Sequence, residues 1–181
     1  MPNPLREPWR AFLHDLDSLL TTTTDLHCLG GFVIGELYDL TRVTADLDVI
    51  SVRGTRMAML QELAGRNSDL HRRHRVYLDV VTVAIVPDHY EERLTDWLPE
   101  EFQHLRLKVL EKHDLVLSKL SRNLDRDRED VSRLCVSAGL DARLLARRYR
   151  SELRYQSARP ERDDLTLELW LEIINEIQGG A

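Results

Sequence analysis

The sequence predicts an α+β protein, in which a small β-sheet with flanking helices is followed by an all-helical part. Two observations predict this division. Short apolar, β-branched segments bounded by glycine or proline occur in the front half, and helical periodicity is continuous from Lys112 onward. We therefore expect an α/β core over residues 1–111 and a helical C-terminal subdomain over residues 112–181.

Composition narrows the class of protein. The chain has 181 residues, of which 43% are hydrophobic and 31% charged, as is typical of a soluble globular protein. Its net charge of −6 argues against a protein built mainly to coat nucleic acid. No apolar run approaches the ~20 residues that cross a bilayer, and the start lacks a signal-peptide pattern, so we expect a cytoplasmic protein with no membrane partner. Cys28 and Cys135 lie in apolar contexts without metal-type spacing, which predicts buried free thiols.

The spacing of apolar residues and the positions of turn-forming residues predict the elements of the front half. A polar, basic loop is expected over 65–75, and the segment 104–109 alternates like a strand, which we place at a sheet edge. The other expected elements are helices over 9–20, 32–40, 56–64 and 88–94, and strands over 26–29, 47–52 and 76–86.

The back half reads as four helices. The first runs over 114–123 with Asp114 as its cap, the second over 126–138, and the third begins after Asp141 and reaches about residue 153. The last opens at Asp163 or Asp164. Four apolar residues of this last helix are spaced to face a core or a partner: Leu165, Leu169, Ile173 and Ile177.

Asp46 and Asp48 lie at the entrance of the second expected strand. Residues two apart on a strand point to the same side, so their carboxylates repel each other unless a cation lies between them, and hard divalent ions prefer such oxygens. On its own this pair is equally compatible with a solvated strand end. Upstream, Gly30 and Gly31 allow a close approach of the backbone, and amides at a following helix start attract phosphate.

Asp79 lies inside the apolar strand expected over 76–86. A carboxylate there either faces water from an edge strand or is paired, hydrogen-bonded or bound to a metal. If this strand lies beside the one that carries Asp46 and Asp48, the three carboxylates could hold Mg²⁺ or Mn²⁺ and activate an attacking hydroxyl. That arrangement suits phosphoryl or nucleotidyl transfer.

These residues resemble the nucleotidyltransferase fold of the polymerase-β-like superfamily, and most closely its small bacterial branch of AbiEii-type toxins and related nucleotidyltransferase-like proteins. The resemblance covers about residues 26–134 and implies a small mixed β-sheet core. It is carried by Gly30-Gly31, by Arg42-Val43-Thr44-Ala45-Asp46-Leu47-Asp48, by Asp79, by Asp114-Leu115-Val116-Leu117-Ser118-Lys119-Leu120 and by Arg126-Asp127-Arg128-Glu129-Asp130-Val131.

The resemblance implies roles for the front-half residues. Gly30 and Gly31 would form the turn against which nucleotide phosphates lie. Asp46 and Asp48 would ligate Mg²⁺, while Asp79 would complete the metal site and help to deprotonate the attacking hydroxyl. The usual superfamily signature has Gly-Ser at the turn, and the Gly-Gly of this chain leaves the phosphate contacts to backbone amides.

The resemblance also implies nucleotide contacts outside these carboxylates. Lys119 would approach the triphosphate from the helical half, with Asp127 and Asp130 orienting it or the adjoining helix. Arg42 and Thr44 match positions just before the metal pair, where Arg42 would clamp a phosphate or a carboxylate.

The activity implied is Mg²⁺-dependent transfer of a nucleotidyl group from a nucleoside triphosphate to a hydroxyl, on an RNA or tRNA end or on a protein. AbiEii-type resemblance further implies a toxin of a bacterial toxin–antitoxin or defence system, with a cognate antitoxin as partner. The alternative is a catalytically inactive nucleotidyltransferase-like module that binds a partner or a nucleotide. The two differ in whether the three aspartates reach one cation.

Two basic groups stand apart from these motifs. They are the tract His71-Arg72-Arg73-His74-Arg75, and the helical face formed by Arg143, Arg147, Arg150 and Arg154. Each is compatible with a solvated, acid-paired surface or with contact to an RNA backbone.

Overall fold

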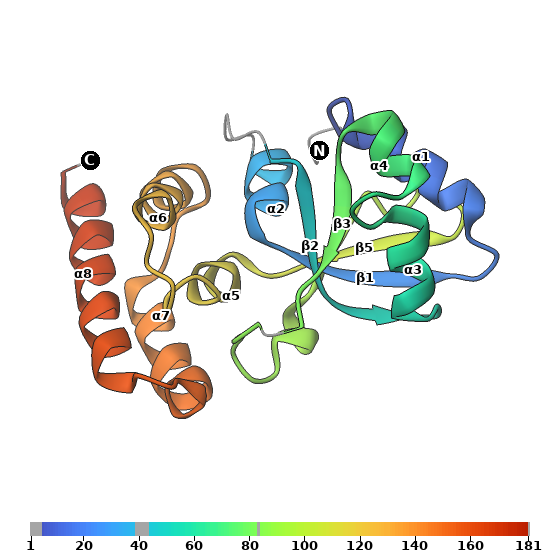
Figure 1. Cartoon of the computed structure of the whole chain (residues 1–181). Helices are drawn as coiled ribbons and strands as arrows, with labels where there is room; N and C mark the ends of the chain where they lie inside the picture. The colour runs from blue at the N-terminus through green and yellow to red at the C-terminus, as the bar shows by residue number, and fades with distance from the viewer. Residues whose placement is uncertain (1–4, 39–43, 83, 181) are drawn as a thin grey trace. The chain divides into compact units, whose positions relative to one another are not determined.

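A computed structural model describes residues 5–38, 44–82 and 84–180 of the chain (Figure 1). The chain forms two compact units. The first, here called the sheet unit, comprises Met1–Val83 and Leu94–Leu110. The second, the helical unit, comprises Ala84–Arg93 and Glu111–Ala181.

The sheet unit is built on a five-stranded mixed sheet in the order β3-β2-β1-β5-β4. The pairs β1–β2 and β4–β5 are antiparallel, whereas β1–β5 and β2–β3 are parallel. The central strand β1 is nearly continuously buried, and only Asp25 of its residues is partly exposed. The α+β class and the mixed sheet are thus confirmed. The strands are β1 (Thr24–Leu29), β2 (Asp46–Arg53), β3 (Tyr77–Val80), β4 (Thr95–Trp97) and β5 (Leu105–Val109).

Helices of the sheet unit pack through aromatic rings. Trp9 of α1 lies 4.7 Å from Phe32 of α2 between ring centroids, and Phe32 lies 5.6 Å from Trp97 of β4. Along β2, Leu47 and Val49 are fully buried, while the alternate residues are partly exposed. One face of the sheet is therefore the core face, and the other carries the polar side chains of β2. The helices are α1 (Trp9–Leu19), α2 (Gly30–Leu37), α3 (Met57–Ala64) and α4 (Asp69–His74).

The helical unit gathers around α8, whose Leu167, Trp170 and Ile174 are buried. Its elements are η1 (Tyr90–Arg93), α5 (Lys112–Leu117), α6 (Asp125–Ala138), α7 (Ala142–Arg148), η2 (Tyr149–Leu153), η3 (Arg154–Gln156) and α8 (Pro160–Gly179). The segment Ala84–Arg93 belongs to this unit because Arg93 donates to Glu152 at 2.8 Å and Tyr155 donates to Asp88.

Asp114 does not cap a helix, contrary to expectation. Helix α5 begins earlier, at Lys112, and its cap is Glu111, whose carboxylate accepts from the His113 N–H at 3.0 Å. Asp114 is fully buried and is held between two guanidiniums, Arg93 at 2.8 Å and Arg148 at 2.9 Å. The helix expected to reach residue 123 ends at Leu117.

The front half also departs from expectation in three places. The expected basic loop contains the short helix α4, which Ser68 caps by accepting from the His71 N–H. Strand β3 ends at Val80, and after the bond from Val81 N–H to the Val49 carbonyl the chain turns to the helical unit. Strand β5 lies between β1 and β4, so it is not an edge strand. The three-residue β4 covers it.

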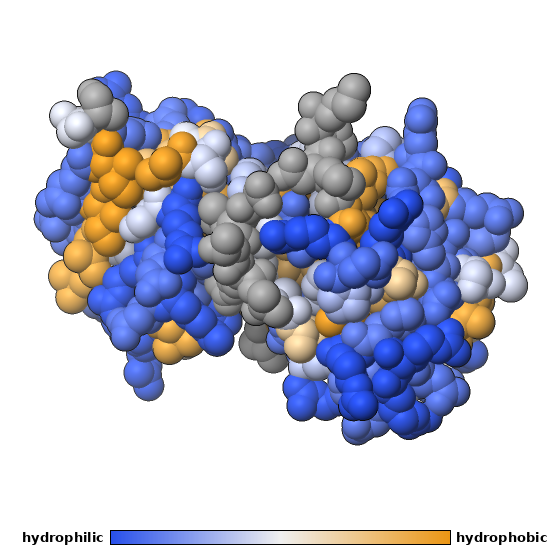
Figure 2. All heavy atoms as spheres, turned by 90° about the horizontal axis from the view of Figure 1, so that it is seen from above, coloured by the Kyte–Doolittle hydropathy of each residue, from blue (hydrophilic) through white to orange (hydrophobic). Residues whose placement is uncertain are grey.

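In the back half, α8 begins at Pro160 and not at Asp163 or Asp164 as expected, since proline is well suited to the first turn of a helix. Leu165 is 68% and Leu169 37% exposed, so the expectation that they face a core is wrong, whereas a role in contacting a partner stays a prediction. Figure 2 shows apolar patches on a mostly hydrophilic face of the molecule. Asp141 caps α7 as predicted, accepting from two backbone N–H groups at 2.8 and 3.0 Å.

Both cysteines are buried free thiols, as predicted. In the described ranges, no helix is long and apolar enough to cross a membrane.

Candidate active site

The register of β2 against β3 places the three predicted aspartates on one face of the sheet. Asp48 and Asp79 are directly paired between the two parallel strands, and Asp46 is paired with Tyr77 in the same register. Asp46 and Asp48 are two residues apart on β2 and therefore share a face. The structure thus brings together three backbone positions that are 33 residues apart in the sequence at most. Metal binding by them stays a prediction.

The three carboxylates differ in their surroundings. Asp79 is exposed, whereas Asp46 and Asp48 are partly buried. The hydroxyl of Thr44 donates a hydrogen bond to the Asp46 carboxylate. Among the described residues, no three His, Cys, Asp or Glu side chains are gathered closely enough to hold a metal ion. The hydrogen bond from Thr44 orients the Asp46 carboxylate, and the expected contact of Thr44 with a nucleotide stays a prediction.

Asp48 lies against the glycine turn. Strand β1 ends at Leu29, which pairs with Asp48, and Gly30 then opens α2 with a φ of +77°. A Cβ atom at Gly30 would lie only 2.0 Å from Oδ2 of Asp48. Glycine is required here both by the left-handed backbone and by this close approach. Gly30 and Gly31 are both buried in the first turn of α2.

The neighbouring thiol is chemically silent. Cys28 is fully buried, and burial, followed by the charge of Asp48, raises the pKa of the Cys28 thiol far above its usual range. A thiolate is the reactive form of cysteine, so Cys28 offers no nucleophile at neutral pH.

An acidic side chain of α2 is neutralised from the N-terminal segment. The buried carboxylate of Glu36 accepts from Nη2 of Arg6 at 3.1 Å and from the Arg6 backbone N–H at 3.1 Å. The same guanidinium also donates to the Gly35 carbonyl at 2.6 Å. No sequence pattern pointed to Arg6, because its partners lie about 30 residues away.

Lys119 belongs to the helical unit, where its ammonium is buried. Its Nζ lies 3.4 Å from Oδ1 of Asp127 and 3.1 Å from Oδ2 of Asp130. Asp127 also accepts from Arg122 at 2.9 Å and from the Leu124 N–H at 3.0 Å, at the start of α6. Burial raises the pKa of Asp127, but these hydrogen bonds outweigh it and leave that pKa below its usual value.

This cluster brings together Lys119, Asp127 and Asp130, the lysine and the two acids that the resemblance linked. Its geometry is that of a buried ion cluster, which orients the lysine and stabilises the start of α6. Contact between Lys119 and a phosphate stays a prediction, as does nucleotide binding by either aspartate. Arg42 lies outside the described residues.

The first basic group is largely paired with acids, and in the second group Arg154 is paired with one. Arg73 and His74 both contact Asp15, at 2.7 and 2.8 Å. Arg154 donates to Asp164 at 2.8 Å. These contacts favour the interpretation of acid-paired surfaces for the residues involved.

Comparison with known families identifies one family model that matches this chain. A family model described as "Nucleotidyltransferase of unknown function (DUF6036)" matches residues 12–178. Searches of curated proteins and of solved structures give no match. Because the family match spans nearly the whole chain, the protein belongs to this family of nucleotidyltransferases of unknown function.

Proposed function

We propose that the protein is a Mg²⁺-dependent nucleotidyltransferase that moves a nucleotidyl group from a nucleoside triphosphate to a hydroxyl acceptor. The observation that carries this proposal is the pairing of Asp48 with Asp79 on adjacent parallel strands, with Asp48 against the glycine turn. Family membership supports the reaction class.

The chemistry of the donor set suits a hard divalent ion, but the three described side chains do not lie close enough together to hold one as they stand. Asp46, Asp48 and Asp79 offer carboxylate oxygens, which Mg²⁺ and Mn²⁺ prefer, and they share one sheet face. When bound, such an ion supplies charge neutralisation and activation of the attacking oxygen. Binding of such an ion requires the three side chains to move together, and it requires the Asp46 carboxylate to leave or share its hydrogen bond from Thr44.

The residues of the chain have separate tasks in the proposed reaction. The acceptor oxygen forms a bond to the α-phosphorus, the bond from that phosphorus to the α–β bridging oxygen breaks, and pyrophosphate leaves. The hydroxyl proton passes to a carboxylate oxygen of Asp79, which is exposed and can release it to water. Backbone N–H groups at the start of α2, at Gly30 and Gly31, bind phosphate oxygens.

The acceptor and the biological role belong to the same proposal. We propose an RNA or tRNA end, or a protein side chain, as the acceptor, and a role as the toxin of a toxin–antitoxin or defence system. Support for this comes only from the AbiEii-type resemblance of the segments 42–48 and 114–131. The same resemblance is the only support for the predicted phosphate contacts of Lys119, Arg42 and Thr44.

The proposal is tested by nucleotide binding and by label transfer. Each nucleoside triphosphate is titrated calorimetrically with and without Mg²⁺, and α-labelled nucleotide is incubated with the protein and total tRNA. We expect Asp48→Asn and Asp79→Asn to abolish Mg²⁺-dependent binding and transfer. The matched control is Asp96→Asn, which changes an exposed carboxylate on β4 at the opposite edge of the same sheet. Full activity in Asp48→Asn would refute the proposed metal site. Nucleotide binding that needs neither Mg²⁺ nor Asp48 would instead identify an inactive binding module.

A further inference from the structure

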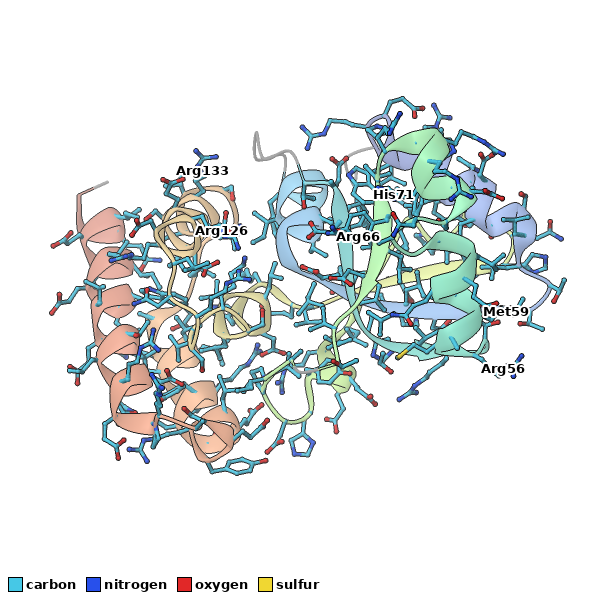
Figure 3. The ribbon with its side chains drawn as sticks, viewed as in Figure 1. Arg56, Met59, Arg66, His71, Arg126 and Arg133 are labelled. Atoms are coloured by element: carbon cyan, nitrogen blue, oxygen red, sulfur yellow. The ribbon has the colours of Figure 1, made fainter. Side chains whose placement is uncertain are left out.

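An arginine that no motif singled out stands beside the carboxylate face. Gly65 ends α3, and Arg66 follows it in the short connection to α4. Nη2 of Arg66 donates a hydrogen bond to the Tyr77 hydroxyl, and its Cζ lies 4.6 Å from the centroid of the Tyr77 ring. The ring of His71 packs at 5.0 Å from the same ring. Figure 3 shows Arg66 and His71 together beside β3.

Tyr77 ties this arginine to the candidate active site. Tyr77 is the partner of Asp46 across the β2–β3 pair and lies two residues before Asp79 on β3. Neighbouring strands lie about 4.8 Å apart, and residues two apart on a strand share a face. Two neighbouring cross-strand pairs on this face of the sheet are therefore Asp46 with Tyr77 and Asp48 with Asp79. The guanidinium of Arg66 contacts one member of these pairs, Tyr77.

The charge of Arg66 is not used in an ion pair among the described residues. Other arginines of the sheet unit, such as Arg6 and Arg73, are bound by carboxylates. Arg66 is exposed and its hydrogen-bonded partner in the described ranges is a neutral hydroxyl. A guanidinium has five N–H donors in a planar fork, so most of them remain directed at solvent. That fork matches the oxygens of a phosphate group.

The position of Arg66 is also fixed before any ligand binds. Its cation rests on the face of an aromatic ring, and one N–H is held by the hydroxyl of the same ring. The ring itself is buried, 7% exposed, and packed by His71. A side chain held in this way loses less rotamer freedom when it binds an anion than a free surface arginine does.

We propose that Arg66, positioned by Tyr77, binds a phosphate group of the substrate at the carboxylate face. This rests on the proposed function for the identity of the substrate. The phosphate comes either from the nucleoside triphosphate or from the backbone of a nucleic-acid acceptor, since both offer the same anionic oxygens. A cation at this place offsets the repulsion between three carboxylates and an anionic substrate.

The first measurement follows the Arg66 side chain directly. Its Nε–Hε resonance, assigned by its loss in Arg66→Gln, is monitored in the ¹⁵N-labelled full chain while inorganic triphosphate is added without metal. We expect this resonance to shift. The resonance of Arg56, an exposed arginine at the other end of α3, should not (Figure 3).

The second measurement compares binding in matched variants. Arg66→Gln should weaken the phosphate-bearing ligand about tenfold, and Tyr77→Phe about two- to threefold, because the phenylalanine ring keeps the stacking and loses the hydroxyl. Arg56→Gln should stay within about twofold of the wild type. A weaker Kd for Mg²⁺–nucleotide assigns the contact to the triphosphate. An unchanged nucleotide Kd with a higher KM for total tRNA assigns it to the acceptor backbone.

The outcomes separate this inference from the proposed function. If nucleotide binds in an Asp48-dependent way while the Arg66 resonance stays unmoved and Arg66→Gln binds and reacts like the wild type, the inference is overturned and the function stands. If the resonance shifts but no nucleotide binding depends on Asp48, the phosphate site stands and the function falls. If neither response is seen, both are wrong.

Discussion

Replacing Gly30 by alanine tests the link between the glycine turn and the Asp48 carboxylate. The added Cβ has two consequences. Gly30 has a φ of +77°, a conformation that costs an L-residue about 1–2 kcal/mol. The Cβ would also lie 2.0 Å from Oδ2 and 2.9 Å from Cγ of Asp48, where ordinary contact begins at 3.4 Å. The carboxylate therefore has to move by more than 1 Å.

The magnitudes predict a specific loss. The backbone cost alone lowers the free energy of unfolding by about 1–2 kcal/mol, which most folded domains survive. A carboxylate displaced by an ångström or more no longer occupies the ligand position beside Asp79, and such a displacement costs about a hundredfold in activity. We therefore expect Gly30→Ala to remain folded at 25 °C and to lose Mg²⁺-dependent nucleotide binding.

The control is Gly139→Ala at the end of α6. Gly139 also has a positive φ, of +64°, but a Cβ there meets nothing within 4 Å. The free energy of unfolding of both variants is measured by urea titration with tryptophan fluorescence as the probe. Both variants are also titrated with Mg²⁺ and nucleotide. Gly139→Ala should be less stable than the wild type but should bind Mg²⁺ and nucleotide with the same affinity. A folded Gly30→Ala that binds Mg²⁺–nucleotide like the wild type would refute the reasoning, because the position of Asp48 would then be irrelevant to the site.

Two further predictions concern the helical unit. Lys119→Met leaves its two buried carboxylate partners without their shared cation, and should lower the free energy of unfolding by about 3–5 kcal/mol, measured through Trp170 fluorescence. Retained nucleotide affinity in a folded Lys119→Met would contradict the predicted phosphate contact. Burial raises the pKa of Glu111, but His113 and Arg148 outweigh it and lower the pKa to about 2. The stability that this carboxylate contributes, up to about 3 kcal/mol, is complete above pH ~4.5 and is lost as the pH falls toward 2. The wild type should therefore lose more unfolding free energy than Glu111→Gln between pH 6 and pH 3, and equal losses would contradict the assignment.

Local patterns predicted the strands and helices that carry the carboxylates. Period-two alternation placed Asp46 and Asp48 on one side of a strand, and this needs no knowledge of the partner strand. The neighbour of that strand is a tertiary property. The pairing of Asp48 with Asp79 could only be stated as a condition, and the structure supplies it.

Contacts between distant residues were not predictable from the sequence. Arg66 meets Tyr77 across the whole of α4, and Arg6 meets Glu36 across α1 and β1. Neither arginine belongs to a periodic or spaced motif. Thr44 was expected to touch nucleotide because of its place in a resembling segment, and its bond to Asp46 appears only in three dimensions.

Short elements were lost for a different reason. Helix α4 has six residues and β4 has three, so neither contains enough repeats to give a periodic signal. Helix α4 depends on its Ser68 cap and on the contact of its residues with Asp15, while β4 depends on pairing with β5. Asp114 was predicted to cap a helix because aspartate is among the preferred N-cap residues. The two guanidiniums that form ion pairs with it, those of Arg93 and Arg148, come from segments distant in the sequence.

The path of the chain has a consequence for how this protein can be divided. The backbone passes between the two units three times, since Ala84–Arg93 leaves the sheet unit before β4 and β5 complete it. A gene truncated after Leu110 would encode all five strands and yet strip Arg93 of Asp114 and Glu152. Expressing the two units separately would thus leave the segment Ala84–Arg93 without the helices whose side chains it contacts. Because each unit is built from two separate segments of the chain, the two units have to be expressed together.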